Sequence, residues 1–441
     1  MTTYNKHRIN YDYDFFMKII FLLFTIDIFL RIINYDFASA LETLSIILLI
    51  CIVIFNLLFV GDKKIQIKSA MYIFFILYLL INIVFSYLYR IFVNNVSPAN
   101  LILAIFYQFR LSVIGFLFFV IFFYIKNNYK FEKFIINLLK IGVLYTIFEQ
   151  IASLIGFRDF FQKIYFRAGV VTSNLINLKE LGLYRVWGLV GSTELLGVYN
   201  LILFAFLIFD ENIDEKKTTK YLSLIWILLS FCAVIFSTSK TAYIILLFLL
   251  FILIIIKKNN KIIKYCLILF SLLIFLILLW LNRNNIILIN FYLGTVFYFT
   301  DLILRYHMNR IINNSLHKMN LSLILHILFG RGLTFGFKIK NLFPYAHTLD
   351  RYKDIPEVNH FFLSFIDQYG LFGYSLFIYL FFIKPLISIY NKVFIKYNAV
   401  LIILFLAFFH YPVLPSKLIV LYISYAIFIV YFSKNQIKYA K

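Results

Sequence analysis

The stretch Pro356-Glu-Val-Asn-His-Phe-Phe-Leu-Ser-Phe-Ile-Asp-Gln-Tyr-Gly-Leu-Phe-Gly-Tyr374 joins the longest polar region of the chain to an apolar segment. Asn359 and His360 fall at this junction, and the residues after them are apolar enough for a membrane span. We expect His360 in the first turn of that helix, at the membrane surface. Outward from this corner, the rest of the chain is predicted to be a scaffold of apolar helices.

Composition sets the class of protein. Of the 441 residues, 63% are hydrophobic and only 14% are charged. A water-soluble core cannot bury so large an apolar surface. We therefore predict an all-α polytopic membrane protein that forms one integral membrane domain over residues 1–441.

About twelve apolar runs approach the roughly 20 residues that a spanning helix needs. They cover residues 15–33, 38–60, 70–93, 101–125, 137–156, 190–209, 221–237, 241–256, 262–281, 359–383, 398–412 and 416–433.

Lysines orient these runs, because the lysine-rich connections fall on one side when the runs are counted alternately. These lysines are Lys63, Lys64, Lys68, Lys126, Lys130, Lys133, Lys216, Lys217, Lys220, Lys257, Lys258, Lys261, Lys264, Lys384, Lys392, Lys396, Lys434, Lys438 and Lys441. The positive-inside tendency assigns that side, with both termini, to the cytoplasm.

Arginines follow the opposite distribution. Under this topology Arg110 lies inside the fourth run, and every other arginine except Arg8 lies at the outer side. A guanidinium binds phosphate bidentately, whereas a lysine ammonium is a hydrated point charge. We therefore expect an outward-facing site for phosphate or pyrophosphate, with lipid-headgroup anchoring as the alternative for each arginine.

Two outer connections are long enough to build such a site. The loop 157–190 ends in the glycine-rich stretch that contains Arg185, and the loop 282–358 is expected to cap the site with short helices on the membrane surface. In the second loop, Arg305 and Arg310 point about 140° apart on a helix, so they are not expected to serve one phosphate together. Arg310 lies on a polar face of this helix, which is expected to face solvent. Arg305 is therefore the better candidate for the phosphate site.

Other candidates each have a second interpretation. Gly330 and Gly332 form a lone Gly-x-Gly, which fits a phosphate loop or an ordinary turn. Arg110 is costly within the membrane and either reaches the lipid-pyrophosphate site or pairs with Glu149 or Asp27.

The order of these features resembles the O-antigen polymerase and O-antigen ligase superfamily of bacterial envelope enzymes. The matching pieces are Arg185-x-x-Gly188 entering a span, Phe236-Ser-Thr-Ser-Lys-Thr241 entering another, the outer loop with an early arginine and a later Gly330-x-Gly332, Asn359-His-Phe-Phe-Leu, and Tyr369-Gly-Leu-Phe-Gly373. Lys240 stands where the family usually has arginine.

The resemblance implies a GT-C-type membrane glycosyltransferase that uses neither a metal nor another cofactor, in the bacterial cytoplasmic membrane with its site on the outer face. Its donor and acceptor would be polyprenyl-pyrophosphate-linked glycans, with a chain-length regulator and a flippase as membrane partners and no nucleic acid. Arg185 and Arg305 would hold the pyrophosphate, and His360 would act on the acceptor hydroxyl. Glu194 would orient Arg185 or contact the acceptor.

The residue types suit this chemistry independently. Guanidinium groups stabilise the charge that develops on a pyrophosphate leaving group. A histidine that titrates near neutrality can deprotonate a sugar hydroxyl, although a histidine at a helix start can also simply bond to backbone. We expect a polymerase of lipid-linked repeat units, with direct displacement that inverts the anomeric centre. The alternatives are a ligase that moves finished glycan to a lipid or protein acceptor, and a transporter or flippase for an anionic lipid-linked substrate.

Overall fold

The structure is a computed structural model that describes residues 5–59, 71–81 except 73 and 80, 128–167, 184, 186–209, 217–256, 328, 361–407 and 417–432. This described part is helical and contains no strand. The helices are α1 (Asn5–Ile33), α2 (Tyr35–Phe59), α5 (Asn128–Ala152), α6 (Arg158–Arg167), α7 (Thr193–Ile208), α8 (Lys217–Phe236), α9 (Lys240–Ile256), α13 (Phe361–Ile378), α14 (Lys384–Tyr390), α15 (Ile395–Ala407) and α16 (Lys417–Phe432). Two π-helical turns, Ser153–Phe157 and Tyr379–Ile383, continue α5 and α13.

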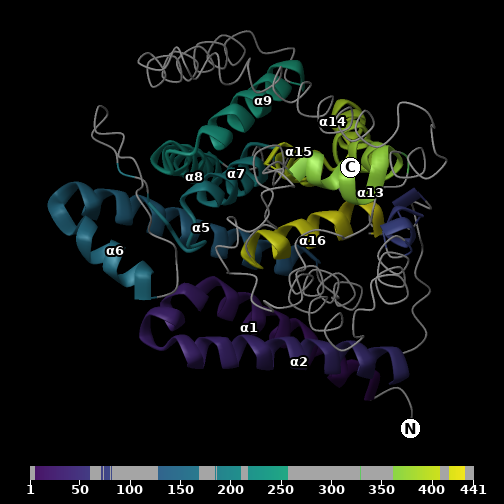
Figure 1. Ribbon diagram of the computed structural model, residues 1–441, viewed down its shortest axis with the longest axis horizontal. Helices are drawn as coiled ribbons and strands as arrows, with labels where there is room; N and C mark the ends of the chain where they lie inside the picture. Colours follow the sequence, from purple (N-terminus) through teal and green to yellow (C-terminus); the bar gives the residue numbers. More distant parts are fainter. Residues whose placement is uncertain are drawn as a thin grey trace, which may run out of the picture.

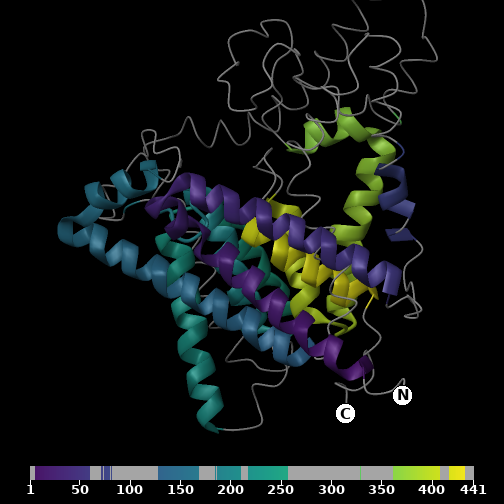
Figure 2. The same cartoon turned by 90° about the horizontal axis from the view of Figure 1, so that it is seen from below.

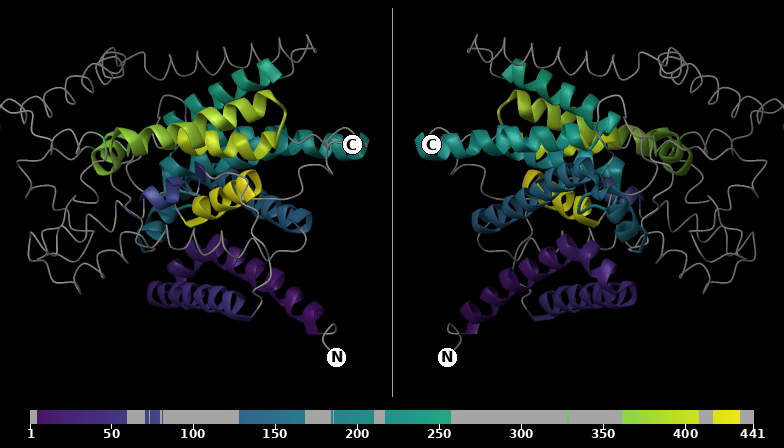
Figure 3. Two further views of the ribbon diagram at one scale, coloured as in Figure 1. Left: turned by 90° about the vertical axis from the view of Figure 1, so that its right-hand side faces the viewer. Right: turned by 90° about the vertical axis from the view of Figure 1, so that its left-hand side faces the viewer.

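The helices stack in layers (Figure 3). The hairpin of α1 and α2 forms one outer layer, α5 and α16 lie next to it, and α7, α8, α13 and α15 lie beyond them. At one end of α5 the chain bends at Gly156, whose φ is +108°, and α6 folds back from there to contact α1 (Figures 1 and 2). The loop predicted for 157–190 therefore starts with a helix.

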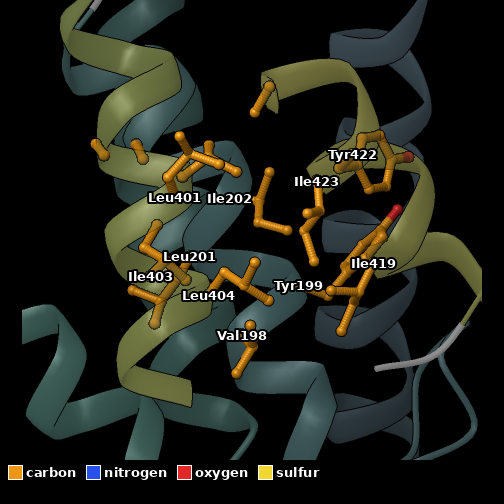
Figure 4. Packing of buried hydrophobic residues seen from close by; sticks show 14 of the residues in the cluster. Val198, Tyr199, Leu201, Ile202, Leu401, Ile403, Leu404, Ile419, Tyr422 and Ile423 are labelled. Atoms are coloured by element: carbon orange, nitrogen blue, oxygen red, sulfur yellow. The ribbon is translucent and has the colours of Figure 1, made fainter. Parts of the chain in front are cut away.

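The core is centred on α7 and α15. Both helices are apolar on every side, a pattern typical of a helix surrounded by others, and nearly all their side chains are buried. Leu201 of α7 lies beside Leu404 of α15, while Tyr199 of α7 packs on Tyr422 of α16 with ring centroids 5.8 Å apart (Figure 4). The segment that leads into α7 is thereby attached to a helix whose side chains are nearly all buried.

The second half of helix α5 is polar inside and apolar outside. Its outward stripe consists of Ile141, Leu144, Phe148 and Ile151, each of which is about half exposed. Its inward face beyond Val143 carries three buried polar residues, which are Thr146, Glu149 and Gln150, and the buried Ser153 follows in the π-helical turn. A contiguous apolar stripe on the outside is what a lipid-facing helix presents.

Among the residues that the structure describes, two stretches are long and apolar enough to cross a membrane, namely Lys130–Phe166 and Tyr369–Tyr390. Shorter apolar helices occupy Leu195–Ile208, Tyr221–Phe236, Thr241–Ile254, Ile395–Ala407 and Tyr422–Tyr431. The all-helical class and the presence of long apolar helices are thus confirmed in the described part. The runs 101–125 and 262–281 lie outside it, so the number of spans stays a prediction.

Helices α5 and α15 begin at the same end of the bundle. Near the start of α5, the Glu132 carboxylate accepts hydrogen bonds from Lys396 and Tyr397 at the start of α15. The predicted topology also requires these two ends to share a side. The far end of α5 is where the chain enters α7.

Candidate functional site

Most of the predicted site residues lie outside the described part of the chain. These are Arg110, Arg185, Arg305, Arg310, Gly330, Gly332, Asn359 and His360. Glu194 and Lys240 lie in the first turns of α7 and α9, and the description of these two residues stops at the backbone. Of the predicted capping loop 282–358, only Leu328 is described.

A buried carboxylate holds the segment that follows Arg185. Oε1 of Glu149 accepts a hydrogen bond from the backbone N–H of Trp187 at 2.9 Å, and Oε2 accepts one from Gly188 at 2.8 Å. Glu149 is 0% exposed. These two bonds fix the backbone of residues 187 and 188 against the end of α5.

Tyr165 of α6 joins the same carboxylate. Its hydroxyl lies 2.9 Å from Oε2 of Glu149, 3.1 Å from the carbonyl oxygen of Gly188 and 3.2 Å from the hydroxyl of Tyr145. The Tyr165 ring also packs on the Trp187 indole, with centroids 5.0 Å apart. The bend at Gly156 is what returns α6 toward α5 and allows this contact.

Tyr184, on the other side of Arg185, is held by the next residue of α5. The Gln150 amide, oriented so that both of its groups are satisfied, donates to the carbonyl oxygen of Tyr184 at 2.9 Å and accepts from its N–H at 3.0 Å. The Arg158 guanidinium lies over the Tyr184 ring, 4.6 Å from the centroid. Consecutive residues of α5 therefore grip the chain before and after Arg185.

A glycine turn leads from this grip into α7. Gly188 and Gly191 adopt positive φ values of 60° and 67°, a conformation that glycine reaches without strain. Gly191 donates to the carbonyl oxygen of Gly188 at 3.3 Å, and the Ser192 hydroxyl caps α7 by accepting from the Leu195 N–H. A side chain at Gly188 would place its Cβ 2.2 Å from Leu196, so the turn packs directly on α7.

The turn Ser237–Ser239, between α8 and α9, reaches the same end of α7. A Cβ at Gly197 would lie 2.4 Å from the Ala242 Cβ and 2.8 Å from both Ser237 Oγ and Ser239 Cβ. One helical turn further along, the Asn200 amide donates to the carbonyl oxygen of Ala233 at 3.1 Å. The structure thus brings together the backbone segments of two predicted motifs, which carry Arg185 and Lys240.

Thr238 gives this turn an unusual backbone. Its φ is +52°, a left-handed conformation that costs energy for a β-branched residue. The side chain is 2% exposed, and its hydroxyl has no hydrogen-bond partner in the structure as described. Ser237 and Ser239 instead bond to nearby backbone groups, which closes the turn just before Lys240.

The glycine motif after His360 produces a bend in α13. Gly370 has φ +69° and ψ 178° within the helix, and the carbonyl oxygen of Tyr369 accepts a hydrogen bond from the Tyr78 hydroxyl. A Cβ at Gly373 would lie 2.7 Å from the Tyr78 ring. The two glycines of Tyr369-Gly-Leu-Phe-Gly373 therefore allow the bend and the close packing of Tyr78.

Arg31, one of the arginines predicted at the outer side, forms structural ion pairs. Its Nε lies 2.8 Å from Asp27 and its Nη2 lies 2.7 Å from Glu42. Asp27, one of the two partners expected for Arg110, is bound to Arg31. Glu149, the other expected partner, has a role that its sequence context does not reveal, because it binds backbone groups 38 and 39 residues later.

The described geometry contains two polar turns at the start of α7, both packed closely enough to keep a fixed spacing. Their sequences add a guanidinium and an ammonium group, which suit an anionic ligand. Comparisons of the chain with family models, curated proteins and solved structures found no match.

Proposed function

We propose that this chain is a membrane glycosyltransferase that polymerises polyprenyl-pyrophosphate-linked oligosaccharide repeat units. The observation that supports this most is the meeting of two turns at the start of α7. The segment with Arg185 is gripped by Glu149 and Gln150, and Gly197 lets the turn before Lys240 pack against the same helix. Two cation-bearing segments held at one end of a central helix suit a diphosphate.

The proposed reaction is a direct displacement at the anomeric carbon of the donor sugar. The acceptor hydroxyl oxygen forms the new glycosidic bond while the bond from the anomeric carbon to the pyrophosphate oxygen breaks, which inverts the configuration. Arg185 and Arg305 neutralise the charge that develops on the departing polyprenyl pyrophosphate. His360 accepts the proton of the acceptor hydroxyl as general base.

The proposed setting is the bacterial cytoplasmic membrane, with about twelve spans and both termini in the cytoplasm. The exposed apolar stripe of α5 supports a lipid environment, since water-soluble proteins rarely leave so long a stripe uncovered. The site would then lie on the outer face, at the end of the bundle opposite the contact between Glu132 and Lys396. A flippase that delivers repeat units to that face and a chain-length regulator are the expected partners.

A deletion strain tests the reaction class. Loss of a polymerase should leave single repeats on the final acceptor, visible as one short band in a glycan gel. Full-length polymer that accumulates on the carrier lipid would instead identify a ligase, and unmodified single repeats trapped on the cytoplasmic leaflet would identify a flippase.

The binding chemistry is tested by Arg185→Lys and Arg305→Lys, which keep the charge and remove the bidentate fork. Each variant should lose most of its polymerising activity at an unchanged protein level. Near-normal activity in both variants would instead favour the alternative that these arginines anchor lipid headgroups.

A further inference from the structure

We infer that Glu149 is a positioning residue, which holds the segment of Arg185 in the geometry that binds pyrophosphate. This inference rests on the proposed function and deepens it, because it assigns a task to a buried residue that does not itself reach the ligand. Three observations carry it: the choice of a carboxylate, the donors that it binds, and their place around Arg185.

A carboxylate is an unusual choice for this position. Glu149 is 0% exposed on the polar face of a long apolar helix. Burial of a carboxylate in such surroundings is unfavourable unless hydrogen bonds compensate for the lost hydration. A residue with that cost is expected where no cheaper side chain can do the same work.

The donors around Glu149 explain why a neutral side chain would fail. Two backbone N–H groups and the Tyr165 hydroxyl converge on its two oxygens at 2.8 to 2.9 Å. An ionised carboxylate only accepts, so it can serve all three donors, whereas the NH₂ group of a glutamine would face one of the N–H groups. The three donors therefore suit a carboxylate better than the amide of a glutamine.

The bonds of Glu149 and Gln150 bracket Arg185. Gln150 fixes Tyr184, one residue before the arginine, and Glu149 fixes Trp187 and Gly188, two and three residues after it. Since both side chains come from the end of one helix, the two ends of this short stretch cannot move independently. Bidentate binding of phosphate by a guanidinium depends on its geometry, and a misplacement of about 1 Å in an active site can cost about 10²-fold in reaction rate.

The experiment uses the full chain purified in detergent and the variant Glu149→Gln. Trypsin cleavage after residue 185 reports the freedom of the segment, and titration with inorganic pyrophosphate reports binding. The lost charged hydrogen bonds should accelerate cleavage after residue 185 and weaken pyrophosphate binding, each by about tenfold or more. Glu42→Gln is the matched control, because Glu42 is also a buried carboxylate but binds Arg31, and it should leave both readouts unchanged.

A double variant separates positioning from a purely structural role. If Glu149 acts through Arg185, then Glu149→Gln combined with Arg185→Lys should bind pyrophosphate no more weakly than Arg185→Lys alone. If the losses of pyrophosphate affinity in the two single variants instead multiply in the double variant, the inference is overturned. Normal cleavage or normal pyrophosphate binding in Glu149→Gln would also overturn the inference. The proposed function would still stand in that case if Arg185→Lys binds pyrophosphate weakly. If Arg185→Lys itself binds as tightly as the wild type, the proposed role of Arg185 falls and the inference falls with it.

Tyr165→Phe keeps the test decisive if Glu149→Gln does not fold. This variant removes one of the three donors and preserves the ring that packs on Trp187. We expect cleavage after residue 185 to be faster than in the wild type, but by a smaller factor than in Glu149→Gln. Unchanged cleavage would contradict the inference.

Discussion

Gly197→Ala is predicted to separate the two turns at the start of α7. The added Cβ would lie 2.4 Å from the Ala242 Cβ and 2.8 Å from Ser239 Cβ. Carbon atoms prefer separations of about 3.5 to 4.0 Å, so α7 must move away from the start of α9 by about 1 Å. Neither neighbour can swing aside, because in both the contact atom is attached directly to the backbone.

Two magnitudes follow from this displacement. Overpacking of a tight contact costs about 1 to 3 kcal/mol of folding free energy, which should lower the Tm of the purified protein by a few degrees. A displacement of about 1 Å between the segments of Arg185 and Lys240 should lower polymerising activity by roughly 10²-fold. The activity loss should therefore be much larger than the loss of folded protein explains.

Gly142→Ala provides the comparison. Its Cβ would lie 2.4 Å from the Tyr199 ring, at the contact between α5 and α7, so a similar drop in Tm is expected. Gly142 is seven residues from Glu149, or about 10 Å along α5, and its variant should keep most of its activity per folded molecule. Repeat-unit polymerisation by purified protein in detergent, measured beside thermal unfolding, checks both. Full activity and an unchanged Tm in Gly197→Ala would refute the proposed packing of the two turns.

Three further predictions address the base, the topology and a structural arginine. His360→Ala should lower the rate by about 10² to 10⁴-fold and abolish the acidic limb of the pH profile, expected near the ordinary histidine pKa of about 6.5; an acidic limb that survives in the variant would point to another base. In a cysteine-free background, a cysteine at Asn341 should react with an impermeant thiol reagent in spheroplasts and one at Lys258 should not, so that labelling at Lys258 would reverse the topology. Arg31→Met should lower the Tm markedly, because it removes an ion-pair partner of the buried Glu42 at a cost of about 3 to 5 kcal/mol. Activity per folded molecule should stay normal, and a selective loss of activity would place Arg31 in the site.

The sequence predicted the apolar helices well because their signal is local. The runs 190–209, 221–237 and 241–256 correspond closely to α7, α8 and α9, since each is mostly apolar and is flanked by polar residues. The end of α5 was less predictable. Gly156 interrupts the helix there, and an arginine-bearing helix follows where a loop was expected.

The grip on the Arg185 segment could not be predicted from the sequence. Glu149 stood out as an ionisable residue in an apolar run, and the natural expectation was a cationic partner such as Arg110. Its actual donors include the backbone N–H groups of Trp187 and Gly188. Every residue except proline has such a group, so no side-chain pattern marks the partner.

The polar face of α5 also constrains how the chain can be made. A carboxylate can add up to about 3 kcal/mol to the free energy of inserting a helix from the translocon into lipid. The groups that bind Glu149 are synthesised 16, 38 and 39 residues later, and at about 5 to 20 residues per second they emerge seconds after α5 itself. During that interval the Glu149 carboxylate lacks the hydrogen-bond donors that surround it in the folded chain. Synthesis of Trp187 and Gly188 therefore supplies the last two donors that compensate for the burial of this carboxylate.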